Sequence, residues 1–165
     1  IALGELLAPA AILTGIQWLL LLIAVGLFGQ VPGGGNLGLG TRLNIGFGIA
    51  CVDPMLNLIT LQIPNAAVLL FPAWFQVGKD GPHGIEATGQ RILFVLGSLL
   101  AFVVVLIPAA LVFSVCFVLV KFFAGWQMAM PVASVAAAFT LAGEAALGVI
   151  VLGWLFERFD VAGEG

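Results

Sequence analysis

Hydrophobic positions dominate the chain in four long stretches, separated by shorter segments rich in glycine and polar residues. A helix needs about 20 consecutive apolar residues to cross the hydrocarbon core of a bilayer, which is about 30 Å thick. Each stretch reaches that length, so we expect membrane-spanning helices at about residues 6–28, 54–74, 92–120 and 130–156. The pattern predicts an all-α fold, a polytopic bundle of about four transmembrane helices that forms a single domain over residues 1–165.

Local signals set the expected helix ends. Asp53 is a natural N-cap and Pro54 a natural first helical residue, so the second helix is expected to begin there. Pro108 removes a backbone hydrogen bond from the third helix, which is long enough that it should tilt or bend. The segment "QVPGGGNLGLGTRLNIGFG" lies between the first and second expected helices. It is expected to be a surface loop with an interfacial segment at about 43–49, because it lacks the GK[ST] and GxGxxG spacings of phosphate-binding loops.

Composition excludes several classes of protein. Hydrophobic residues make up 62% of the chain and charged residues only 8%, against about a quarter charged in soluble domains. So few charges cannot cover a water-soluble surface. The chain has no tyrosine and no basic tract, which argues against nucleic-acid binding. Because it begins at Ile1 with an apolar run almost at once, we expect it to be the C-terminal part of a longer protein.

Polar side chains inside the predicted spans are the first candidates for function, since such groups usually face protein or water. Asn57, Thr60 and Asn65 are spaced to share one side of the second span. They form either a substrate-facing surface or interhelical hydrogen bonds worth about 1 kcal/mol or less each. The candidates for a substrate path are Gln17, Asn57, Thr60, Gln62, Asn65 and Glu144.

Glu144 is the most unusual of these residues. At 1.5 Å per residue it lies roughly 20 Å along the fourth helix from Pro131, near the middle of the bilayer. An ionised carboxylate there costs several kcal/mol, so the group should be protonated, paired or reached by water. Two interpretations stay open. Glu144 contacts a proton or substrate in a translocation path, or it is a neutral acid hydrogen-bonded to a neighbour such as Gln17 or Gln62.

Enzyme chemistry is not expected. The sequence contains no HExxH motif, no GxSG-like turn with a buried histidine and no pair of membrane-embedded carboxylates for an aspartyl mechanism. Cys51 and Cys116 are far apart in apolar surroundings and are expected to be unreactive thiols. We therefore expect neither catalytic nor metal-binding residues, nor a cofactor held by this chain.

The segment "FPAWFQVGKDGPHGIEATGQR", residues 71–91, concentrates charge between two apolar stretches. It contains four of the 13 Asp, Glu, Lys and Arg residues and the single histidine, His83. With four spans, this segment and both termini lie on one side of the membrane, with Lys79, Arg91 and Arg158, against Arg42 and Lys121 on the other. The positive-inside rule then makes the 75–91 loop and the C-terminus cytoplasmic.

Two motifs carry a resemblance to a known family. "NAAVLLFPAWFQVG" followed by "GIEATGQRILFVLGSLL", and the closing "EAALGVIVLGWLFERFD", resemble the C-terminal membrane region of a bacterial ABC exporter family of ABC-2-like permeases. The resemblance covers about residues 50–162. Its members show a similar FPxW element, a short Gly/Pro-rich loop, a GIExxGQ element leading into the next helix, and a Phe-Asp pair near the C-terminus.

This resemblance implies the permease subunit of an ATP-driven exporter in the bacterial inner membrane. ATP and Mg²⁺ would bind to a separate ATP-binding cassette subunit, and two permeases would form a homo- or heterodimer. The 75–91 loop would then lie where the ATP-binding subunit docks. The candidate coupling residues are Lys79, Asp80, His83, Glu86, Gln90 and Arg91.

Other functions remain open beside this one. The loop charges could simply anchor the protein at the membrane surface, as positive-inside orientation alone would require. The chain could be a membrane scaffold or assembly protein whose polar side chains serve only helix packing. Less favoured is a proton-coupled secondary carrier with Glu144 as its titrating group.

Overall fold

Four long helices make up the computed structural model, which describes residues 2–27, 37–70 and 85–162. They are α1 (Ala2–Leu27), α2 (Leu39–Leu70), α3 (Ile85–Ala124) and α4 (Trp126–Ala162). Each contains a segment long and apolar enough to cross a membrane. The expected all-α helical bundle is therefore confirmed, and the chain is a multi-pass membrane protein.

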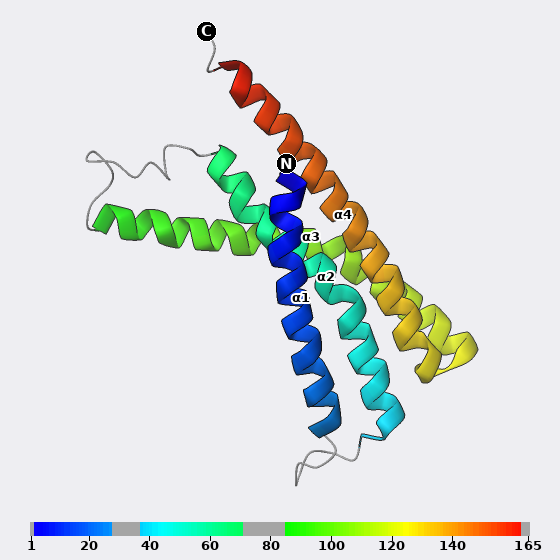
Figure 1. Ribbon diagram of the computed structural model, residues 1–165. Helices are drawn as coiled ribbons and strands as arrows, with labels where there is room; N and C mark the ends of the chain where they lie inside the picture. Colours follow the sequence, from blue (N-terminus) through cyan, green and yellow to red (C-terminus); the bar gives the residue numbers. More distant parts are fainter. Residues whose placement is uncertain (1, 28–36, 71–84, 163–165) are drawn as a thin grey trace.

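Helix α4 holds the bundle together. It packs along both α2 and α3, whereas α1 packs mainly on α2. Figure 1 shows α1 beside the first half of α2, and the second half of α3 beside the first half of α4. The start of α1 and the end of α4 lie toward one end of the bundle, and the α3–α4 turn lies toward the other (Figure 1).

Small side chains on α4 allow this close packing. Every fourth residue from Ala129 to Ala145 is buried, and four of these five residues are alanine. Residues four apart lie on one face of a helix, so these residues form a narrow stripe against which other backbones can pack. Leu141 and Ala145 join Ile59 of α2 and Ala109 of α3 in one buried cluster. The core is therefore where α2, α3 and α4 meet.

Most other apolar side chains point outward. Phe122 and Phe123, for example, are each 83% exposed, and only 6% of the most apolar part of α3 is buried. Such a surface is stable where hydrocarbon surrounds the helices, since lipid tails are as apolar as leucine. Helix α3 has 40 residues, about 60 Å at 1.5 Å per residue, and it changes direction about midway (Figure 1). Pro108 is the proline inside it, and proline is the common cause of a helix bend.

The expected start of the second helix at Asp53 and Pro54 is wrong. Helix α2 begins at Leu39, with the Gly38 carbonyl accepting hydrogen bonds from the first-turn amides of Thr41 and Arg42. Asp53 is thus an interior residue and not an N-cap. Of the segment expected to be a loop, residues 39–48 are helical, and residues 30–36 lie outside the described ones.

The glycines that suggested a loop serve close helix packing instead. A Cβ atom on Gly46 would lie 2.8 Å from Val25 Cγ2 of α1, and a Cβ on Gly48 would lie 2.6 Å from Ser134 Oγ of α4. Real Cβ atoms do not come this close to their neighbours. These positions therefore favour glycine, because a side chain there would force Val25 or Ser134 to move.

The turn between α3 and α4 is a single residue, Gly125. Its φ angle is +80°, a left-handed conformation that glycine adopts without a steric penalty. Its amide donates to the Lys121 carbonyl at 3.1 Å, which ends α3, and its own carbonyl accepts from Ala129 at 3.2 Å, which starts α4. Because the turn is so short, α3 and α4 pack against each other directly.

Candidate functional site

Two cavities and a set of interhelical hydrogen bonds contain several of the polar side chains of the described spans. The first polar contact joins α1 and α2. Asn57 is buried, and its amide nitrogen donates to Thr14 Oγ1 at 3.0 Å and to the side-chain oxygen of Gln17. The Asn57–Gln17 contact brings together two residues of the predicted substrate path. Thr14 was missed, because one threonine in an apolar run is not distinctive without its partner.

The second polar contact joins α2 and α4. Gln62 is buried, and its Nε2 donates to the Ala145 carbonyl at 2.9 Å. Gly148 lies against the Gln62 amide oxygen, so closely that a Cβ at this position would collide with it. The absence of a side chain at Gly148 therefore allows Gln62 to reach the backbone of α4.

Glu144, which is half-buried, lies beside this contact in a cavity of about 390 Å³ between α2, α3 and α4 that is open on its outer side and that we call the Glu144 cavity. Its lining residues are Ile59, Gln62, Ile63, Ala66, Val105, Glu144, Leu147, Gly148, Val151 and Leu152. The Oε2 atom of Glu144 is buried and has no hydrogen-bond partner among the residues that the structure describes. Gln62 shares the cavity with Glu144, but its donor nitrogen bonds to Ala145.

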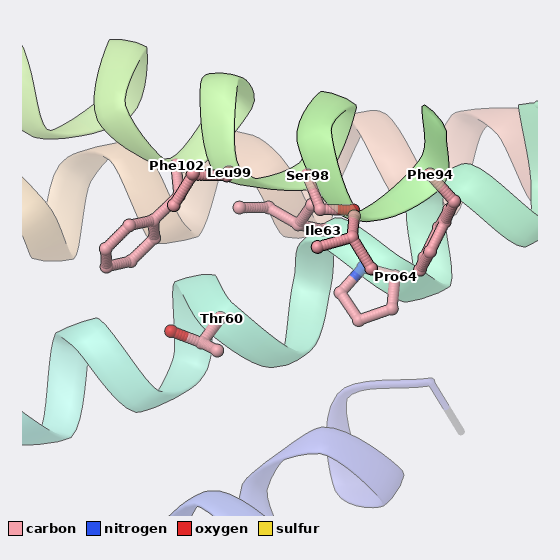
Figure 2. Close-up of a pocket in the computed structure, with 8 residues that line it drawn as sticks. Thr60, Ile63, Pro64, Phe94, Ser98, Leu99 and Phe102 are labelled. Atoms are coloured by element: carbon pink, nitrogen blue, oxygen red, sulfur yellow. The ribbon is translucent and has the colours of Figure 1, made fainter. Parts of the chain in front are cut away.

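A second cavity of about 360 Å³, the Pro64 cavity, lies between α2 and α3. Its lining residues are Thr60, Ile63, Pro64, Phe94, Val95, Ser98, Leu99 and Phe102. Phe94 and Phe102 reach from α3 toward α2, with Ser98 and Leu99 between them (Figure 2). The lining is nearly all apolar, so the Pro64 cavity offers little to orient a polar ligand.

Thr60 and Asn65 do not join the other polar residues. Both are exposed, and each donates to a carbonyl of its own helix, Thr60 to Leu56 and Asn65 to Leu61, both at 2.7 Å. Asn57, by contrast, points toward α1. The three residues therefore do not form one polar surface, although their spacing suggested it.

Two of the prolines inside the helices, Pro54 and Pro131, leave backbone carbonyls that neighbouring side chains satisfy. Pro54 has no N–H for the Ala50 carbonyl, and the indole Nε1 of Trp18 in α1 donates to that carbonyl at 3.1 Å. Pro131 likewise leaves the Gln127 carbonyl without its helical donor, and Asn44 Nδ2 donates to it at 3.1 Å. Such replacement is what makes proline tolerable in a membrane helix.

Arg42 satisfies a third backbone carbonyl. Its Nη1 donates to Val25 at 3.1 Å, and Val25 lies in the last turn of α1, where carbonyls have no helical donor. A cation at a helix C-terminus also interacts favourably with the helix dipole. Arg42 therefore stabilises the contact between the end of α1 and the beginning of α2.

Most of the predicted coupling residues lie beyond the structural description. Lys79, Asp80 and His83 lie outside the described residues, and Glu86 belongs to the first turn of α3 with its side chain outside them. Gln90 and Arg91 lie further along α3, where Arg91 is exposed. No cluster of metal-ligating side chains occurs among the described residues. Comparison with protein families, with curated proteins and with solved structures gave no match for this chain.

Proposed function

We propose that this chain is the membrane-spanning permease subunit of an ATP-driven exporter that works with a separate ATP-binding subunit. The observation that carries the proposal is the Glu144 cavity. It places a buried carboxyl oxygen without a hydrogen-bond partner inside a membrane-length helix, next to a second polar side chain, Gln62. Intramembrane ionisable groups are costly and mark substrate or ion pathways, proton relays, voltage sensors or ligand counter-ions.

Helix geometry is compatible with transport. Alternating access requires helices that can change their relative angle, and α2 and α3 carry interior prolines near the two cavities. In this proposal ATP-driven closure of the partner subunits would rock these helices against α4. The ATP and Mg²⁺ belong to the partner, and a pair of permeases would complete the path in the bacterial inner membrane.

The 75–91 segment would be the docking site for the ATP-binding subunit, on the cytoplasmic side together with the C-terminus. Support comes from the resemblance of the sequence motifs and from the concentration of charge. The proposal treats Glu86, Gln90 and Arg91, on the first turns of α3, as the helical part of that docking site. A motion of the docked subunit would then pass directly into α3.

The test is a pull-down of the tagged full-length protein from detergent-solubilised membranes, with bound ATP-binding proteins identified by mass spectrometry. We expect an ATP-binding cassette subunit to be recovered with the native protein and lost with the double variant Glu86→Ala/Arg91→Ala. The matched control is Lys121→Ala, which removes a charge at the opposite end of α3 and should retain the partner. If no such subunit is recovered under conditions that preserve other ABC complexes, the proposal is wrong.

A proton-coupled carrier is the second candidate, because the same Glu144 carboxyl could exchange protons. Transport by a carrier would stop with an uncoupler and survive ATP depletion, and the ATP-driven permease predicts the reverse. A scaffold would show no transport and would tolerate Glu144→Gln. One assay in membrane vesicles, with each energy source removed in turn, separates the three functions.

A further inference from the structure

The Glu144 cavity has the chemistry of a binding site for a particular class of small molecule. Its size of about 390 Å³ lies within the range of about 300–1,000 Å³ found for small-molecule pockets. Such pockets are mostly apolar and contain a few polar groups that orient the ligand. This cavity has that composition, with Gln62 and Glu144 as the polar side chains in its lining.

Both polar groups offer acceptors. The Oε2 atom of Glu144 is buried without a partner among the described residues, and the Gln62 oxygen faces Gly148. The Gln62 nitrogen is already bonded to the Ala145 carbonyl. The lining contains no lysine, arginine or histidine. An anion would therefore meet acceptors and no positive charge, whereas a cation would provide the charge that a carboxylate in an apolar cavity lacks.

The rest of the lining selects for an apolar body. Ile59, Ile63 and Val105 form much of the wall, and Leu147 and Val151 are 63% and 53% exposed on the outer face of α4. In a membrane that outer face meets hydrocarbon. A strongly hydrated ion such as Na⁺ gains nothing from such walls, but an apolar molecule can enter from the lipid phase and exchange one apolar environment for another.

Glu144 also lies well inside the membrane-length part of α4. It is 18 residues after Trp126 and ten before Trp154, which is about 27 Å and about 15 Å at 1.5 Å per residue. A ligand bound beside it would therefore lie within the hydrocarbon core, which is about 30 Å thick.

The geometry points to the Glu144 cavity as a binding site for lipophilic monovalent cations. These are molecules with a single positive charge and an otherwise apolar surface. Glu144 supplies the counter-charge, Gln62 an additional acceptor, and the apolar walls of α2, α3 and α4 the contact area. That such a cation is the exported substrate rests on the proposed permease function. Binding itself can be measured without the ATP-binding partner.

Tetraphenylphosphonium and tetraphenylborate are suitable probes, because they have the same shape and opposite charge. Equilibrium binding of radiolabelled tetraphenylphosphonium is measured on the purified full chain in detergent. We expect saturable binding of the cation that excess unlabelled cation displaces and tetraphenylborate does not. Glu144→Gln keeps the shape and removes the charge, and it should weaken binding at least about tenfold, as expected for loss of one partner of a buried charge pair.

Two further variants make the result specific to this cavity. Asp53→Asn removes another carboxyl from a membrane-length helix, outside the cavity, and it should change affinity by less than about twofold, since long-range charge effects are weak. Ala66→Phe places a ring into the cavity without changing its charge, and binding should be lost. This variant also keeps the test decisive if Glu144→Gln does not fold.

The inference is overturned if tetraphenylphosphonium shows no saturable binding, if tetraphenylborate binds equally well, or if binding survives both Glu144→Gln and Ala66→Phe. These results are separate from those of the pull-down. Cation binding without a recovered ATP-binding subunit would support the site and refute the exporter, and the converse result would refute the site alone.

Discussion

The hydrogen bond between Trp18 and the Ala50 carbonyl should matter only because Pro54 is present. In a regular helix the amide of residue 54 would donate to that carbonyl, but proline has no N–H. The indole of Trp18 donates instead, at 3.1 Å, from a helix that lies earlier in the chain. If this account is right, replacing Pro54 by a residue with an amide should make Trp18 dispensable.

The magnitude follows from two measured classes of interaction. A carbonyl left without a donor where water is absent costs about 1–3 kcal/mol, and interhelical hydrogen bonds in membrane proteins average about 0.6 kcal/mol with a maximum of about 1.7. Trp18→Phe should therefore lower the free energy of unfolding by about 1 kcal/mol through the lost hydrogen bond, in addition to the lost packing of the smaller ring. In the Pro54→Ala background only the packing loss should remain.

A double-mutant cycle isolates this difference, because the packing loss is common to both backgrounds and cancels. The four proteins, native, Trp18→Phe, Pro54→Ala and the double variant, are unfolded reversibly in mixed micelles by titration with sodium dodecyl sulfate. Loss of helix is followed by circular dichroism, which does not depend on the tryptophan that is removed. We expect a coupling energy of about 1 kcal/mol, roughly a fivefold change in the unfolding equilibrium constant.

Trp126→Phe is the matched control. The Trp126 and Phe117 rings pack edge to face with their centroids 5.3 Å apart, so Trp126→Phe also removes an indole and some packing. This substitution should show no coupling to Pro54→Ala. If Trp18→Phe costs the same in both backgrounds, the indole does not replace the missing amide and the reasoning is refuted.

Three further predictions concern other contacts and use the same unfolding assay. Asn44→Leu should cost about 1 kcal/mol in the native protein and less beside Pro131→Ala, which restores the helical donor; equal costs would contradict the role of Asn44. Gly148→Ala should cost about 1–3 kcal/mol, because its Cβ collides with the neighbouring glutamine amide, whereas Gly143→Ala, with open space around it, should not destabilise the protein. Gly125→Ala should cost about 1–2 kcal/mol, because alanine is strained at a φ of +80°; an unchanged stability would show that the turn tolerates another conformation.

The candidate site could be predicted from the sequence only in part. Glu144 is recognisable in the sequence because a carboxyl within a long apolar run contradicts the rest of the pattern. Its relation to Gln62 is not, since the two residues come from separate helices and are 82 positions apart in the sequence. Thr14 and Trp18 were not predicted as hydrogen-bonding partners for a similar reason, because each looks ordinary until its partner on α2 is known.

The fold class and the number of helices follow from the sequence by itself. Each apolar stretch exceeds the thickness of a bilayer, and a backbone in hydrocarbon must satisfy its own hydrogen bonds, so each stretch has to be a helix whatever packs against it. The start of α2, by contrast, could not be predicted from local sequence rules. Local rules place a helix start at Asp53 and Pro54 and a loop at glycines such as Gly46 and Gly48 before them, and α2 contradicts both expectations from Leu39 onward.

Tertiary structure decided that boundary, because the free-energy cost of placing a proline or a glycine inside a helix depends on the residues of the neighbouring helices. Trp18 supplies the donor that Pro54 lacks, and Val25 and Ser134 occupy the space that side chains at Gly46 and Gly48 would need. A proline and two glycines that would end an isolated helix are therefore accommodated in the middle of this one. Apolar length is a local property of the chain, but hydrogen-bond satisfaction and close packing exist only between helices.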